Sequence, residues 1–199
     1  MPTCRFFIRS MLPLAVLLIA GAGVARGQNA AKPPDVGGRA PDFSLEETGG
    51  KPLGLWALTA RKPVVLVVLR GYPGYQCPLC NSQVAEFITS AKELEAAGAE
   101  VVFVYPGPAG ELKKHAEEFL GSQTLPSGFH LVLDPDYKTV ALYGLRWDTT
   151  NETAYPATFV IDSQNTVRFR KVSQSHGDRT KPAELLKVLP QTREPGNGP

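Results

Sequence analysis

The feature that most constrains the fold is an unbroken apolar run at residues 63–69, Pro-Val-Val-Leu-Val-Val-Leu. A run that is rich in β-branched side chains and lacks polar alternation is typical of a strand with both faces of its sheet covered. After a loop rich in glycine and tyrosine, apolar residues recur at helical spacing from Val84 to Leu94, and Gly98 follows them. The pattern predicts a buried central strand, followed by a helix of about five turns.

The rest of the chain alternates short strands and helices, which predicts an α/β fold with a central mixed β-sheet flanked by helices. A Gly-Gly turn near the start predicts an N-terminal β-hairpin extension. The expected strands are 41–45, 53–55, 100–105, 129–133, 158–162 and 167–169, and the expected helices are 111–120, 138–143 and 182–189.

The chain begins with an export signal, which predicts a secreted or periplasmic protein. Residues 1–27 have a basic front, an apolar stretch of about 15 residues and small residues at the expected cleavage site. An uncleaved N-terminal membrane anchor is the alternative, although about 20 apolar residues are needed to span a bilayer. No stable membrane insertion is expected once the signal is removed. We expect a flexible linker at 28–40, one domain at 41–190 and a flexible tail at 191–199.

Charge argues against nucleic-acid binding. Three of the 21 Lys and Arg residues precede residue 28 and no Asp or Glu does, so the rest of the chain has 18 bases and 19 acids. No run of five or more Lys or Arg residues occurs. A near-neutral protein without a basic patch is not expected to have nucleic acid as a partner.

The motif Cys77-Pro78-Leu79-Cys80 lies where the loop after the central strand meets the long helix. Free backbone N–H groups and the helix dipole at that position favour a thiolate, so the pKa of Cys77 should fall below its ordinary value. Cys80 lies about one helical turn later, where its sulfur can close a disulfide with an oxidised Cys77. We predict that Cys77 is the nucleophile and that Cys80 resolves it.

Three other roles for the two cysteines fit less well. A structural zinc site needs four ligands, and the three histidines of the chain are scattered without metal spacing. Haem attachment needs a histidine directly after the second cysteine, where Asn81 stands. A purely structural disulfide would close a very small loop and constrain the unfolded chain little. No metal and no other cofactor is expected.

A second feature is Tyr155-Pro156 immediately before the apolar segment Ala-Thr-Phe-Val-Ile-Asp. A proline there is either an edge or turn residue of the strand, or part of a cis Tyr155–Pro156 bond that brings the backbone beside the cysteines. The cis alternative predicts an edge close to the thiols that is open to a partner chain.

Together these segments resemble the thioredoxin fold and, more narrowly, the peroxiredoxin-like alkyl hydroperoxide reductase and thiol-specific antioxidant family. The resemblance spans about residues 40–189 and includes the opening Ala-Pro-Asp-Phe at 40–43. It implies that Cys77 is the peroxidatic cysteine, with a hydroperoxide as substrate. It also implies that Cys80 forms the disulfide, which a thioredoxin-like or small-thiol reductant opens.

The loop before Cys77 departs from the pattern of that family. Peroxiredoxins usually have Pro seven residues and Thr or Ser three residues before the peroxidatic cysteine, and here Arg70 and Gly74 stand at those positions. We expect Arg70, Tyr72 and Tyr75 to polarise the substrate instead, as substrate-binding residues together with Tyr155 and Pro156.

Three functions remain open from the sequence. The first is a thiol peroxidase for hydrogen peroxide or organic hydroperoxides. The second is an exported thioredoxin-like oxidoreductase that acts on protein disulfides, which the CxxC motif and Pro156 favour. The third is a thioredoxin-fold binding module without turnover, in which the cysteine pair would be inert.

Overall fold

The predicted central strand lies inside a sheet of seven strands. A computed structural model describes Met1 and residues 31–189. The strands are Ser44–Glu47 (β1), Pro52–Gly54 (β2), Val64–Val68 (β3), Glu100–Gly107 (β4), Phe129–Pro135 (β5), Ala157–Ile161 (β6) and Val167–Val172 (β7). The sheet order is β2-β1-β5-β4-β3-β6-β7. All residues of β3 are buried, and β3 pairs in parallel with β4 and antiparallel with β6. The predicted mixed sheet is confirmed.

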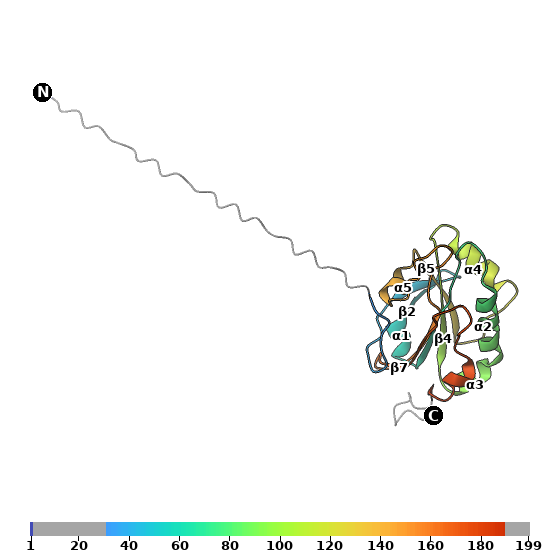
Figure 1. Cartoon of the computed structure of the whole chain (residues 1–199). Coiled ribbons are helices and arrows are strands. Elements are labelled where there is room, and N and C mark those ends of the chain that lie inside the picture. Colours follow the sequence, from blue (N-terminus) through green and yellow to red (C-terminus); the bar gives the residue numbers. More distant parts are fainter. Residues whose placement is uncertain (2–30, 190–199) are drawn as a thin grey trace.

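Helices cover both faces of the sheet, which is why β3 has no polar face. The helices are Leu55–Thr59 (α1), Pro78–Thr89 (α2), Ala91–Ala96 (α3), Leu112–Leu120 (α4), Lys138–Leu142 (α5) and Pro182–Leu185 (α6). Val65 and Val67 pack with residues of α2, α3, α4 and α6, whereas Val64 and Leu66 pack with residues of α1 and α5. Figure 1 shows α1 and α5 on one side of the sheet and α2 and α4 on the other.

The long helix predicted after the central strand is two helices. Helix α2 ends at Thr89, Ser90 leaves helical geometry with ψ near 16°, and α3 begins at Ala91. The apolar spacing continues across the break, because Val84 and Phe87 of α2 and Leu94 of α3 all enter the same core cluster. The last predicted helix is also shorter, since α6 ends at Leu185.

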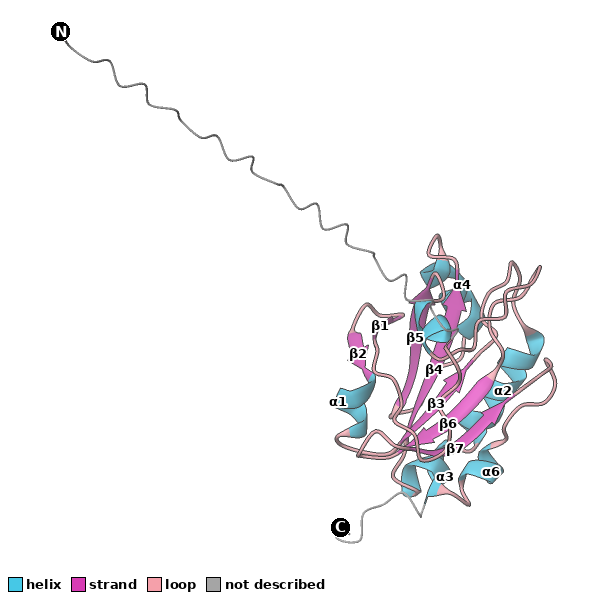
Figure 2. Cartoon of the chain, turned by 60° about the vertical axis from the view of Figure 1, so that its left-hand side comes forward, coloured by secondary structure: helices cyan, strands magenta, loops and turns pink. Residues whose placement is uncertain are grey.

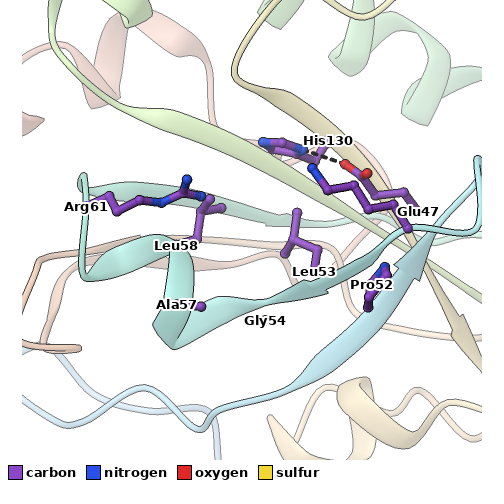
Figure 3. Close-up of a pocket in the computed structure, with 9 residues that line it drawn as sticks. Glu47, Pro52, Leu53, Gly54, Ala57, Leu58, Arg61 and His130 are labelled. Carbon is purple, nitrogen blue, oxygen red and sulfur yellow. Dashed lines mark hydrogen bonds and ion pairs between the residues drawn. The ribbon is translucent and has the colours of Figure 1, made fainter.

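The N-terminal hairpin joins the far edge of the sheet through β1, which pairs with both β2 and β5 (Figure 2). Its end is held by His130 of β5, whose ring nitrogens lie 2.6 Å from Glu47 and 3.1 Å from Glu100. Figure 3 shows Glu47 and His130 beside a cavity of about 130 Å³ under the hairpin and α1. No cysteine lines this cavity.

Part of the segment predicted as a linker lies against the β6–β7 hairpin. The N–H of Gly37 donates to Val167 and the N–H of Ala40 donates to Asn165, both at 2.8 Å. The predicted signal at 1–27 and the tail at 191–199 lie outside the described residues, apart from Met1. Within the described part of the chain, no helix has the length and apolar character needed to cross a membrane.

Candidate active site

The two cysteines lie at the start of α2, on the helix that follows β3. Cys77 is the N-cap residue of α2, and Pro78 occupies the first turn, where its missing N–H costs no helical hydrogen bond. Both cysteines are free thiols, and their exposed fractions are 3% for Cys77 and 0% for Cys80. Cys77 is therefore accessible only to a small reactant, and Cys80 is fully buried.

The loop between β3 and Cys77 is fixed to the end of β4. Gly71 has φ +75°, and a Cβ at this position would lie 1.9 Å from the Pro106 oxygen, so only glycine fits the close approach. The N–H of Tyr72 donates to the same Pro106 oxygen at 2.9 Å. Nearer the cysteine, the Tyr105 hydroxyl donates to the Gln76 side chain at 2.8 Å. These contacts hold the backbone that positions Cys77.

Polar contacts around the first cysteine stabilise its thiolate. The Cys80 thiol and backbone N–H donate to the Cys77 sulfur, and Arg179 and Arg70 add positive charge, so the pKa of Cys77 falls to about 5 despite its burial. Burial and the hydrogen bond to Cys77 raise the pKa of Cys80 well above its ordinary value. The pair is therefore divided into a thiolate at Cys77 and a thiol at Cys80.

Arg179 is a residue of this site that sequence reasoning missed. Its Nη2 lies 3.8 Å from the Cys77 sulfur, and its Nη1 donates to the Gln83 side chain at 2.9 Å. Its Nε donates to the carbonyl of His176 at 2.8 Å, which orients the guanidinium. A single arginine in the polar segment before α6 belongs to no sequence motif, and only the tertiary structure brings it to Cys77.

Arg70, which was expected to bind substrate, already makes contacts within the protein. Its Nε lies 2.7 Å from the Glu152 carboxylate, its Nη1 donates to the Tyr75 hydroxyl at 2.7 Å, and its Nη2 donates to the Asn151 carbonyl at 2.5 Å. Burial alone would lower the pKa of Arg70, but the hydrogen bonds from Arg70 to Glu152 and Tyr75 outweigh burial and raise it. The side chain is 3% exposed. Arg70 therefore acts on Cys77 through the electrostatic field of its positive charge.

The tyrosines expected in the site lie in different places. Tyr75 lies on Arg70 and is 47% exposed. Tyr72 stacks on the His115 ring with 3.7 Å between the centroids, and Tyr155 stacks on Trp147 at 4.5 Å. The structure therefore brings Arg70 and Tyr75 together, whereas Tyr72 and Tyr155 each pair with another ring.

The hypothesis of a cis Tyr155–Pro156 bond is wrong, because no peptide bond of the described residues is cis. The Tyr155 N–H donates to Leu145, and the chain then runs directly into β6, so there is no tight turn of the kind that a cis proline serves. Nor is there an open edge, since β6 lies between β3 and β7, and the Pro156 carbonyl accepts the Ser173 N–H at 2.8 Å. Pro156 remains near the end of β3 that leads to Cys77, because Ala157 pairs with Val68.

Comparison with known proteins shows the family of the chain. The model of the AhpC/TSA family matches residues 36–170. The chain belongs to this family. It is 31% identical to chloroplastic peroxiredoxin Q of Arabidopsis thaliana over 132 residues, which are 66% of this chain but only 56% of that relative. It is 27% identical over 164 residues to the thiol-disulfide oxidoreductase ResA of Bacillus subtilis, with 82% of each chain covered.

A solved structure supports the fold. The crystal structure of the peroxidoxin BcpB from Mycobacterium tuberculosis superposes with a TM-score of 0.61 at 25% identity, covering 81% of this chain and 99% of that one. The predicted thioredoxin-like fold is confirmed, and this AhpC/TSA chain is an oxidoreductase with thiol redox function. Among Met1 and residues 31–189, no three His, Cys, Asp or Glu side chains are arranged to hold a metal ion.

Proposed function

We propose that this AhpC/TSA protein is a thiol peroxidase that reduces hydrogen peroxide or organic hydroperoxides through Cys77, with Cys80 as the resolving cysteine. The observation that carries the proposal is the nearly buried residue Cys77, 3% exposed, whose sulfur lies 3.8 Å from a guanidinium and beside a second thiol. Such a sulfur is accessible to the end of a small peroxide but poorly accessible to a folded protein. The family and the peroxiredoxin relatives support the same reading.

The proposed cycle uses each group in the protonation state that the site gives it. The Cys77 thiolate attacks the terminal oxygen of ROOH, the O–O bond breaks, and the leaving alkoxide takes a proton to become ROH. Two electrons pass from sulfur to the peroxide, and Cys77 becomes a sulfenic acid. The Cys80 sulfur then attacks the Cys77 sulfur, and the sulfenic hydroxyl leaves with the Cys80 proton as water. A thioredoxin-like or small-thiol reductant supplies the two electrons that reopen the disulfide.

Arg179 has the position to assist the oxidation step. Its guanidinium lies within reach of the sulfur and stabilises negative charge there, which includes charge that moves onto the peroxide oxygens as the O–O bond breaks. The family position that usually carries Thr or Ser is Gly74, which cannot offer a hydroxyl to a peroxide. We therefore assign to Arg179 the polarising role first expected of Arg70, Tyr72 and Tyr75.

Thiol-disulfide exchange with protein disulfides is the second candidate. It is favoured by the CxxC spacing, by the absence of the usual Pro and Thr or Ser before Cys77, and by the match to ResA along 82% of both chains. A low thiol pKa serves both reactions, because the thiolate is the nucleophile in each.

A stopped-flow experiment separates the two candidates. The reduced protein is mixed with hydrogen peroxide, and the rate of thiol loss is compared with that of free cysteine and with the rate of insulin disulfide reduction. We expect thiol loss orders of magnitude faster than for free cysteine, and none in Cys77→Ser. Thiol loss no faster than for free cysteine, together with rapid insulin reduction, would establish the exchange function instead. Inactivity in both assays would favour the binding module.

The resolving role of Cys80 has a separate test. In Cys80→Ser the Cys77 sulfenic acid should persist under peroxide, because no neighbouring thiol remains to condense with it. Mass spectrometry after trapping with a sulfenic-acid reagent measures it. An unmodified Cys77 in this variant would contradict the proposed cycle.

We also propose that the protein is exported and that residues 1–27 are removed. The support is the basic and apolar pattern of that segment. N-terminal sequencing of the protein recovered from cells should begin near Gln28. A protein that retains its first residues and sediments with membranes would favour the N-terminal anchor.

A further inference from the structure

A small cavity adjoins the cysteine site between α2 and the segment 177–181. Its volume is about 120 Å³. One wall is a face of α2, where residues spaced by one helical turn line it, and the other wall is the segment that carries Arg179. The lining includes Leu79, Gln83, Glu86, Arg179, Thr180 and Lys181.

One residue of the cavity wall, Arg179, also lies beside the reactive sulfur. The Arg179 guanidinium lines the cavity, donates to Gln83 at 2.9 Å and lies 3.8 Å from the Cys77 sulfur. Leu79, two residues after Cys77, also lines it and is 43% exposed. Arg179 therefore links the cavity to the reactive sulfur.

A buried hydroxyl without a partner belongs to a residue that lines the same cavity. Thr180 is 3% exposed, and its Oγ1 has no hydrogen-bond partner, the one such buried side-chain atom in the described part of the chain. A buried hydroxyl without a partner destabilises the fold, which is a reason to expect a ligand that satisfies it. The backbone carbonyl of Thr180 accepts from Gln83, so the hydroxyl remains available as a donor.

The charges and the size of the cavity select the kind of ligand. Arg179 and Lys181 bring two positive charges against one negative charge from Glu86. The structure gives Arg179 no carboxylate partner among the described residues, in contrast to Arg70. A volume near 120 Å³ holds about four water molecules, so it admits a carboxylate with a short carbon chain but no peptide segment.

We infer that this cavity binds the carboxylate of a small carboxylated thiol that reduces the Cys77–Cys80 disulfide. Arg179 holds the carboxylate, the Thr180 hydroxyl donates to it after rotation of the side chain toward the cavity, and Lys181 adds long-range attraction. The thiolate attacks the Cys77 sulfur, a mixed disulfide forms and Cys80 leaves as a thiolate, which takes up a proton. A second thiol of the same class attacks the ligand sulfur of the mixed disulfide. The products are the oxidised ligand disulfide and the Cys77 thiolate. The inference rests on the proposed function only in that the pair must cycle through a disulfide.

The test measures reduction of the oxidised full-length protein by three thiols of different charge. These are 3-mercaptopropionate, 2-mercaptoethanol and cysteamine, with each rate constant expressed per thiolate present. We expect 3-mercaptopropionate to exceed 2-mercaptoethanol about tenfold, cysteamine to be slowest, and salt to reduce the difference. Equal rate constants for the three thiols would overturn the inference.

Two variants locate the effect in the cavity. Thr180→Val should lower the ratio of the mercaptopropionate to the mercaptoethanol rate constant about fivefold, and Lys181→Gln, which changes an exposed side chain, should lower it about twofold. The control is Thr89→Val, whose hydroxyl donates to Ala85 within α2 and does not line this cavity. If Thr180→Val does not fold, Lys181→Gln carries the test. A ratio unchanged in the folded variants would refute the assignment.

Two further outcomes keep this proposal separate from the proposed function. If peroxide forms no Cys77–Cys80 disulfide, the peroxidase cycle fails, and the thiol series is then run on protein oxidised with diamide. A carboxylate could instead accelerate the oxidation step. In that case a carboxylated hydroperoxide reacts faster than tert-butyl hydroperoxide, the three thiols have equal rate constants, and the cavity serves the oxidising substrate. That result would overturn its assignment to the reductant.

Discussion

Replacing Glu152 with glutamine removes the only carboxylate that the described residues place against the buried Arg70. The Arg70 Nε lies 2.7 Å from Glu152 Oε2, and the two side chains are 3% and 12% exposed. The same carboxylate holds His176 through its other oxygen at 2.9 Å. Glu152→Gln keeps the size and one acceptor oxygen, so it isolates the loss of charge.

The expected loss of stability is about 2–3 kcal/mol. Breaking a buried ion pair by removing one partner costs about 3–5 kcal/mol, because the remaining charge is desolvated and uncompensated. The Tyr75 hydroxyl and the Asn151 carbonyl still accept from Arg70, so the cost falls below that range. The carbonyl of the new amide retains part of the lost hydrogen bond.

Urea unfolding followed by circular dichroism measures the change. With a slope of about 2 kcal/mol per molar urea, the midpoint should fall by about 1 M while the slope stays constant. The control is Glu117→Gln, which breaks the exposed ion pair between Glu117 and Lys113. Their charged groups lie 3.9 Å apart, and the two side chains are 57% and 61% exposed. The expected change in the free energy of unfolding is below about 0.5 kcal/mol. If the Glu152 variant unfolds within that same margin, Arg70 does not depend on a buried carboxylate and the reasoning fails.

Five other predictions concern Cys77 and the residues around it. Since the pKa of Cys77 is lowered to about 5, its rate of alkylation by iodoacetamide should stay constant from pH 9 to 7 and fall through pH 5. Mass spectrometry measures the rate, and a rate that still rises above pH 7 would contradict this prediction. By linkage, the lowered pKa stabilises the reduced fold above the ordinary thiol pKa, and this stabilisation is lost as the pH falls toward 5, which urea midpoints across that range would show. Arg179→Gln should move the alkylation midpoint upward by about one pH unit or more, while Arg179→Lys should move it less. Gly71→Ala should lower the free energy of unfolding in urea by more than about 2 kcal/mol, because the new Cβ meets the Pro106 oxygen. Phe87→Ala should lower it by about 3–5 kcal/mol, because a fully buried ring is lost.

Local patterns in the sequence predicted most of the fold. The apolar run at 63–69 predicted β3 because a strand covered on both faces must be apolar throughout, and the structure buries all of Val64–Val68. The break at Ser90 had no such signal. No proline or glycine marks it, and the apolar spacing continues into α3, so the periodicity alone extends the helix across it.

The candidate site was predictable only where its residues are close in sequence. Cys77 and Cys80 share one helix start, so their spacing was enough to place them together. Arg179 joins them from 102 residues further along the chain, and Glu152 reaches Arg70 across 82 residues. Neither residue belongs to a periodic pattern or motif. Glu152 precedes β6 and Arg179 follows β7, so their positions depend on how the segments on either side of the β6–β7 hairpin fold back toward the residues that follow β3.

The two arginines near Cys77 show why residue type alone did not assign their roles. Both are cations close to the same sulfur, but Arg70 is paired with a carboxylate that offsets its charge, whereas Arg179 is held by the uncharged Gln83 and a backbone carbonyl. A cation already neutralised by a neighbour attracts a thiolate weakly, and an unneutralised one attracts it strongly. The unbalanced charge at the site therefore comes from Arg179. The sequence places Arg70 nearer to the motif, but the partners in the fold decide which arginine acts more strongly on the sulfur.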